Sequence, residues 1–244
     1  EDVWGVGYQY ATKLRRLQIN TALDLSKQNI EWAHRNLGGV VGMRLIRELS
    51  GEESMRMNDE RTQKKMIATT RMFGSPVTDI KAIKEAVATY TARAAEKLRR
   101  QHGAATMISV FVVPKEQSHN TYFKHGPTIG DQLLLPVATS ITHELIKPAI
   151  QLVEKLFEPG RIYKKAGVML SHIVPDNTIQ GTLFNPPTTA KNRMLMSAID
   201  NVNFAMRDDM LKFASSGTTR NWKMRQELRS NRYTSRWEEI CKVK

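Results

Sequence analysis

The sequence contains a single cysteine, Cys241, among its 244 residues. One cysteine excludes an intramolecular disulfide framework and a zinc site built from cysteines. The longest strongly apolar stretch, residues 107–113, is far shorter than the ~18 residues that a membrane-spanning helix needs. No secretory signal opens the chain, because Glu1 and Asp2 are acidic and no apolar segment follows them. We therefore expect a protein of the reducing cytoplasm with no membrane partner.

Recognisable catalytic motifs are also missing. The six histidines form no i, i+4 pair, and the sequence has no phosphate-binding loop, nucleophile elbow or dinucleotide fingerprint. Two-metal phosphoryl transfer needs carboxylates that converge from strands, and the expected strands carry none. The sequence thus predicts a chain that binds rather than reacts, with no catalytic residue, metal site or cofactor of its own.

Acidic residues are in the minority, with 24 Asp and Glu against 37 Lys and Arg, which gives a net charge of +13. Residues 1–63 are neutral, whereas residues 64–170 carry 16 basic and 8 acidic side chains and residues 171–244 carry 12 and 7. A basic surplus attracts polyanions, because each neutralised phosphate releases condensed counterions. A hydrophobic content of 41% excludes a disordered tail. The charge pattern favours nucleic-acid binding over a surface that serves solubility alone.

Residues 1–60 are expected to form a small helical unit, because apolar residues recur at helical spacing between glycines. The unit begins with Val3-Trp4-Gly5-Val6-Gly7, directly before a helix. Two glycines permit a sharp turn, and the free amides at the helix start form a ready phosphate site. This is the mechanism of a helix-hairpin-helix, which grips a DNA backbone without reading bases; an ordinary helix–helix turn is the alternative. A degenerate second copy at residues 37–42 favours the hairpin, and the missing helix before the first copy predicts a longer parent chain.

The periodicity changes at residue 64. We expect strands at residues 65–73, 105–113, 119–123 and 164–170, and helices at residues 79–100 and 141–157, with Pro148 kinking the second helix or marking its start. This β-α-β-β-α-β order is a split βαβ arrangement with both helices on one face of the sheet. The open face should meet water or a ligand, and the basic surplus makes phosphate the expected ligand. The fold class predicted for the whole chain is α+β.

Residues 171–190 are expected to be an extended linker, because prolines, Asn177 and Gly181 interrupt them. Within it lies Gln180-Gly181-Thr182-Leu183-Phe184. A Leu-Phe pair in a polar loop is a candidate peptide ligand for a partner's pocket; the alternative is that Leu183 and Phe184 pack back on the domain. Residues 191–244 are expected to form a mostly helical tail that ends in a basic, aromatic segment, Trp222 to Trp237.

Taken in order along the chain, several motifs resemble those of the UmuC-like bacterial Y-family polymerases. The thumb of that family is resembled by Val3-Trp4-Gly5-Val6-Gly7 and Thr21-Ala22-Leu23-Asp24-Leu25. Its little finger is resembled by Arg71-Met72-Phe73-Gly74 with Val77-Thr78-Asp79, by residues 93–99 and by residues 165–170. Residues 180–184 are similar to the bacterial sliding-clamp-binding pentapeptide, with Gly181-Thr182 in place of the usual Leu and polar residue. Residues 232–237 are similar to the end of the UmuC tail.

The resemblance implies the C-terminal part of the catalytic subunit of a polymerase V type translesion enzyme that acts in the SOS response. It implies a thumb at residues 1–60, a little finger at 64–170, a clamp-binding linker at 171–190 and a tail at 191–244. The palm and fingers, with the carboxylates that hold Mg²⁺ in the parent polymerase, would precede Glu1. Expected partners are primer-template DNA, the sliding clamp, and a UmuD-type protein or recombinase filament near the bacterial nucleoid.

Two groups of site residues follow from these motifs. The expected DNA contacts are Gly5, Gly7 and Lys13 in the thumb, and Thr70 and Arg71 on the first strand of the open sheet. The expected clamp contacts are Gln180, Leu183 and Phe184.

Two alternatives stay open at this point. A self-contained nucleic-acid-binding adaptor could use the same domains, and an exposed pair of stacking aromatics on the central strands would favour it. A small enzyme of ferredoxin-like fold is a weaker alternative, because site residues are missing.

Overall fold

The computed structural model describes residues 1–54, 63–115, 127–181, 184, 190–206 and 209–241. The chain divides into two compact units, residues 1–62 and residues 63–244. Each unit has its own hydrophobic core.

The first unit consists of four short helices: α1 (Tyr8–Arg16), α2 (Ala22–Ser26), α3 (Ile30–Asn36) and α4 (Val40–Leu49). Thr21 begins α2 through a capping box, in which its hydroxyl accepts from the Asp24 amide and the Asp24 carboxylate accepts from the Thr21 amide. Asn29 caps α3 through the Glu31 amide. The small core contains apolar residues from every helix and from the joins between them: Val6, Ala11, Leu14, Ile19, Leu25, Ala33, Leu37 and Ile46.

The second unit is built on a four-stranded antiparallel sheet in the order β1-β4-β2-β3. Its elements are β1 (Ile67–Val77), α5 (Ile80–Arg100), β2 (Gly103–Pro114), β3 (Ile129–Thr139), α6 (Thr142–Leu156), β4 (Tyr163–Pro175) and α7 (Ala190–Met206), followed by 3₁₀ turns at Ala214–Ser216 and Trp237–Glu239. Together with the helical first unit, this sheet confirms the mixed α and β class. Asp79 caps α5 as its position before the apolar run predicts, accepting from the Lys81 and Ala82 amides.

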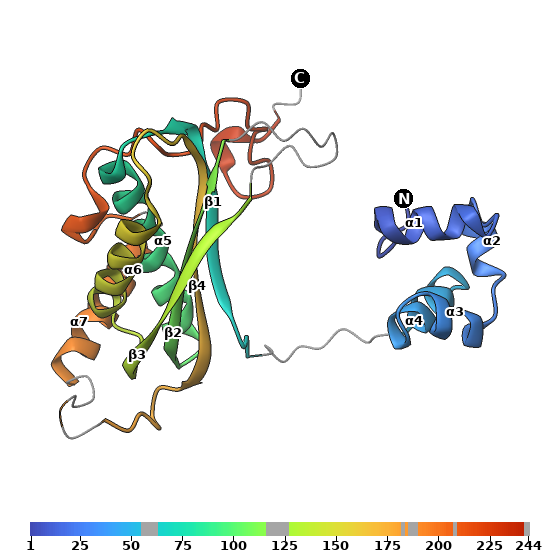
Figure 1. Ribbon diagram of the computed structural model, residues 1–244, viewed down its shortest axis with the longest axis horizontal. Coiled ribbons are helices and arrows are strands. Elements are labelled where there is room, and N and C mark those ends of the chain that lie inside the picture. Colours follow the sequence, from blue (N-terminus) through green and yellow to red (C-terminus); the bar gives the residue numbers. More distant parts are fainter. Residues whose placement is uncertain (55–62, 116–126, 182–183, 185–189, 207–208, 242–244) are drawn as a thin grey trace. The chain divides into compact units, whose positions relative to one another are not determined.

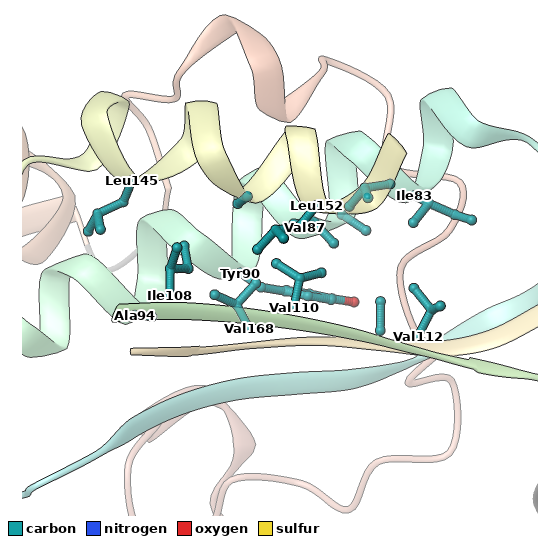
Figure 2. Packing of buried hydrophobic residues seen from close by; sticks show 14 of the residues in the cluster. Ile83, Val87, Tyr90, Ala94, Ile108, Val110, Val112, Leu145, Leu152 and Val168 are labelled. Atoms are coloured by element: carbon teal, nitrogen blue, oxygen red, sulfur yellow. The ribbon is translucent and has the colours of Figure 1, made fainter. Parts of the chain in front are cut away.

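Helices α5 and α6 lie side by side on one face of this sheet (Figure 1). Figure 2 shows their inward residues packed on the strands, with Ile83, Val87, Tyr90 and Ala94 from α5, Leu145 and Leu152 from α6, and Ile108, Val110, Val112 and Val168 from the sheet. Strand residues next in sequence to these point to the opposite, open face, because side chains alternate along a strand.

Three details differ from the sequence-based expectations. The third strand is β3 at residues 129–139, whereas the expected residues 119–123 lie outside the described ranges. Pro136 and Gly130 obscure its alternating pattern, and proline is tolerated because β3 is an edge strand. Strand β4 continues to Pro175, so the linker cannot begin at residue 171. Helix α6 runs on both sides of Pro148, which therefore does not mark its start.

The tail after α7 is also different, because the described residues 209–241 are irregular apart from two 3₁₀ turns. The expectation of a mostly helical tail is therefore wrong beyond Met206. This segment is fixed to the second unit by side chains instead of by its own helices. Trp222 is buried against Tyr90, with the rings edge to face at 5.7 Å, and the Trp222 carbonyl accepts a 3.0 Å hydrogen bond from the Gly74 amide.

Ion pairs hold the same tail against α5. The Arg99 guanidinium donates two hydrogen bonds of 2.7 Å to the Asp200 carboxylate on α7. Arg93 on α5 and Arg220 in the tail both donate to the Asp209 carboxylate, at 3.0 and 2.9 Å. Bidentate and shared carboxylate pairs of this kind fix geometry as well as adding energy. These contacts hold the described tail residues 209–222 on the second unit.

Candidate nucleic-acid interface

The first glycine turn lies directly before α1. Gly5 has φ +91°, in the left-handed region that favours glycine. Gly7 precedes α1 with φ −78°, which any residue adopts, and no side chain caps the helix there. A Cβ at either glycine would meet no heavy atom within 4 Å. The fold therefore does not need glycine at position 7, and a side chain there would obstruct only an external molecule.

A second glycine turn joins α3 to α4, which pack against each other. Gly38 and Gly39 have φ +80° and +70°, and Gly39 precedes α4 without a side-chain cap. Gly42 lets the two helices approach, since a Cβ there would lie 2.6 Å from the Ala33 carbonyl oxygen. The residues of this turn are not among the DNA contacts expected from the sequence. The Leu37-Gly38-Gly39 pattern directly before a helix was the signal that could have identified them.

Lys13 is held beside the second turn. Its Nζ donates a 2.8 Å hydrogen bond to the Asn36 carbonyl at the end of α3. Tyr10 lies one turn earlier on α1, and its hydroxyl contacts Gly38. A Cβ added at Gly38 would lie 2.7 Å from the Tyr10 hydroxyl oxygen. The ammonium of Lys13 thus lies in solvent at the C-terminal end of α3, close to the start of α4.

Thr70 and Arg71 lie on opposite faces of the sheet. Thr70 pairs with Gly167 on the open face, whereas Arg71 pairs with Ala166, a residue of the core beneath α5. Burial raises the pKa of Tyr90 to about 12, and the charges of Arg71 and Arg93 oppose this shift, which places Arg71 on the helix side. The expectation that both side chains contact phosphate through the open face is therefore wrong for Arg71. Successive residues of a strand point to opposite faces.

The open face consists mainly of small and apolar side chains. Gly167 makes room for the Phe111 ring, because a Cβ there would clash with that ring. Lys165 places its Nζ 5.8 Å from the centre of the same ring. Phe111 is the one aromatic residue of the described strands that lies on this face. Its neighbour Val110 is buried on the opposite, helix side, because side chains alternate along a strand. This face can therefore approach a polymer closely but offers little for stacking bases.

Two residues of the expected clamp motif are described. Gln180 is exposed, and Phe184 is exposed over 88% of its surface, so Phe184 does not pack back on the domain. Leu183 lies outside the described residues.

No group of three metal-binding side chains gathers anywhere in the described ranges. Over the same residues, no helix is long and apolar enough to span a bilayer.

Three residues of the tail also adjoin the candidate contact Arg71. Arg220, Trp222 and Lys223 line a small cavity with it. The basic, aromatic composition of this segment was visible in the sequence, but its long-range packing on β1 and α5 was not.

Comparison with known proteins decides the family. Residues 64–183 match the C-terminal domain of the impB/mucB/samB family. This part of the chain belongs to the impB/mucB/samB family. The match confirms the resemblance to UmuC-like proteins. Residues 193–243 match a domain of unknown function, DUF4113.

Relatives of this family align along the whole chain. Protein UmuC of Salmonella typhimurium is 38% identical over 246 residues, and protein SamB of the same species is 33% identical over 245 residues. Both alignments cover 100% of this chain and 57% of the relative, so the chain spans a little over half the length of these family members. Among solved structures, a Y-family DNA polymerase chimera of Dbh and Dpo4 overlays with a TM-score of 0.46 and 18% identity, covering 70% of this chain and 46% of that one.

Proposed function

We propose that this chain is the non-catalytic, DNA-binding and clamp-binding part of a bacterial translesion DNA polymerase that acts in the SOS response to DNA damage. The observation that carries the proposal is the 38% identity to UmuC over the full length of the chain. In this proposal residues 1–60 are a helix-hairpin-helix thumb, residues 64–175 a little finger, and residues 176–190 a linker with the clamp motif. Residues 191–244 form the tail.

The thumb contacts a DNA backbone through its two glycine turns. At Gly7 and Gly39 no side chain caps the following helix, so the first amides of α1 and α4 are available to phosphate oxygens. The open space around Gly7 supports a close approach. Lys13 adds a positive charge beside the second turn. Backbone amides and a lysine read no base, so binding is independent of sequence.

The little finger lays its open sheet face along the duplex. Thr70 and the small residue Gly167 lie opposite each other on that face, and Lys165 supplies a positive charge. Arg71 reaches DNA only at the β1 edge, because its side chain lies on the helix side. The DNA contacts of this proposal are therefore the turns at Gly5, Gly7 and Gly39, the hydroxyl of Thr70, and the cations Lys13 and Lys165, with Arg71 at the edge.

Nucleotide transfer belongs to the parent protein. The parent's palm carboxylates hold Mg²⁺ in this proposal, and they lie outside the present 244 residues. The chain itself binds the primer-template, in the cytoplasm at the bacterial nucleoid.

Gln180, Leu183 and Phe184 tether the polymerase to the bacterial sliding clamp. The exposure of Phe184 supports this role, because an apolar side chain in a polar loop is available to a partner's pocket. Tethering raises the effective concentration of the enzyme at the primer terminus without a new DNA contact. A UmuD-type protein and the recombinase filament are further proposed partners, with no residue assigned to either.

An exposed pair of stacking aromatics on the central strands would favour the adaptor alternative. Phe111 alone occupies such a position in the described sheet. We therefore favour the polymerase component over an RNA-recognition adaptor.

A bulky residue at position 7 tests the thumb contact. Gly7→Val should weaken binding to a primer-template duplex by about tenfold, since one charge-assisted hydrogen bond is worth roughly 1.5 kcal/mol. The thermal midpoint should change little, because the Cβ added at position 7 meets no heavy atom within 4 Å. The matched control is Ala22→Leu, which adds the same number of heavy atoms at the exposed start of α2. Equal affinities for the Gly7 variant and the unmodified chain would remove the thumb from the DNA interface.

A further inference from the structure

A cavity of about 60 Å³ lies on the helix side of the sheet at the β1 edge, between β1, α5 and the tail. Four basic side chains line it: Arg71 from β1, Arg93 from α5, and Arg220 and Lys223 from the tail. The rest of its wall consists of two aromatic residues, Tyr90 and Trp222, and of Thr89, Met224 and Gln226. No carboxylate is part of this lining.

The positive charges around the cavity are only partly neutralised. Arg93 and Arg220 share the single carboxylate of Asp209. Burial by itself raises the pKa of Asp209, but the two guanidinium groups lower it below its ordinary value, so this carboxylate is ionised at neutral pH. Arg71 and Lys223 pair with no carboxylate among the described residues. Four cations therefore face one anion, and an incoming anion would relieve their mutual repulsion.

Two buried donors on the same lining have no hydrogen-bond partner. They are Nε of Arg220 and Nε1 of Trp222, and Trp222 is only 5% exposed. Buried polar groups are almost always hydrogen-bonded, so each orphan calls for a specific explanation. Both atoms have almost no accessible surface, so an acceptor in the cavity reaches them only if the lining shifts.

We propose that this cavity binds a single phosphate group. The planar fork of an arginine matches two oxygens of a phosphate, and Lys223 adds a compact point charge. A water molecule occupies about 30 Å³ of the liquid, so the cavity has room for one tetrahedral oxyanion. The phosphate belongs either to a DNA backbone that passes the β1 edge or to a free phosphate compound.

The site would be completed only when the tail is docked. Arg220, Trp222 and Lys223 come from the part that matches the domain of unknown function, whereas Arg71, Tyr90 and Arg93 come from the family's C-terminal domain. Phosphate binding and tail docking must then strengthen each other by the same factor. If the phosphate is part of DNA, this inference deepens the proposed function and rests on it. The site itself depends only on the charges described above.

The first experiment measures thermal unfolding of the full 244-residue chain with inorganic phosphate. Saturating phosphate should raise the midpoint by about 5 °C, since a ligand that binds only the folded state stabilises it. The rise should be lost in Arg71→Gln and in Lys223→Gln, whose exposed side chains leave the fold intact. It should persist in Lys97→Gln, a matched exposed lysine on α5 outside the cavity.

The second experiment identifies the source of the phosphate. If a DNA backbone occupies the site, Lys223→Gln should reduce the slope of log affinity for duplex DNA against log salt by about one, and inorganic phosphate should compete. If a free phosphate compound occupies it, the thermal effect should be lost in the variant while the DNA slope is unchanged.

The proposal is overturned if both the phosphate-induced shift and the DNA slope are the same in Lys223→Gln as in the unmodified chain. That result leaves the proposed function intact. A wild-type chain that does not bind duplex DNA at all would refute the proposed function and leave the phosphate test to stand by itself.

Discussion

Removing the two apolar side chains of the clamp motif, Leu183→Ala with Phe184→Ala, should separate binding from stability. Phe184 is 88% exposed, so its truncation removes little buried surface and should change the free energy of unfolding by no more than ~0.5 kcal/mol. Clamp affinity should fall roughly 700-fold, because each of the two apolar anchors of so short a ligand is worth ~2 kcal/mol and every 1.4 kcal/mol is about tenfold. The measurements are the thermal midpoint and the affinity for an immobilised bacterial sliding clamp.

Phe73→Ala calibrates the thermal measurement. Phe73 lies in the core of the second unit at 7% exposure, so its loss should cost ~3–5 kcal/mol. In a unit of this size that corresponds to roughly 6–20 °C in the midpoint. If the clamp-motif variant melts as early as the Phe73 variant, or still binds the clamp, then residues 180–184 are part of the fold and the tether reasoning is refuted.

Three further outcomes are expected. The purified chain should incorporate no nucleotide on a primed template with Mg²⁺; template-dependent extension would contradict the assignment of catalysis to the parent's palm. Asp209→Asn should lower the free energy of unfolding by about 1–2 kcal/mol at pH 7. Because the folded pKa of Asp209 is lowered, this contribution exists above its ordinary pKa near 4 and is lost as pH falls below it, so the variant's acid unfolding curve should be flatter. The folded pKa of Tyr90 is raised to about 12, so its stabilisation should disappear between about pH 10 and 12, and Tyr90→Phe should remove that alkaline loss in pH-dependent denaturation.

Local sequence patterns were sufficient to predict the elements in which the apolar periodicity and the capping residue indicate the same boundaries. Helix α5 combines Asp79 as its cap with apolar residues at steps of three and four, and the structure places both as expected. Strand β3 was missed because Gly130 and Pro136 interrupt an alternation that only an edge strand tolerates. Edge position depends on the pairing of the whole sheet, which no local window contains.

Among the candidate contacts, too, some could be predicted from local sequence and others only from the tertiary structure. Gly7 was identified from its place before a helix, and the open space around it suits that role. The placement of Arg71 beside Thr70 on one face could have been rejected from the sequence, because neighbours along a strand alternate. The packing of Trp222 against Tyr90 could not have been predicted from the sequence. The two residues have 131 residues between them, and only the tertiary structure brings them together.

The most direct test of the central claim is the salt dependence of binding to two primer-template duplexes of unrelated sequence. Contacts to phosphate alone predict equal affinities for both duplexes, and a slope of log affinity against log salt of about −0.9 for each phosphate that a lysine or arginine neutralises. With three such contacts, affinity should fall roughly 40-fold between about 50 and 200 mM salt. A strong preference for one sequence, or an affinity that does not change with salt, would contradict the claim that this chain grips the DNA backbone.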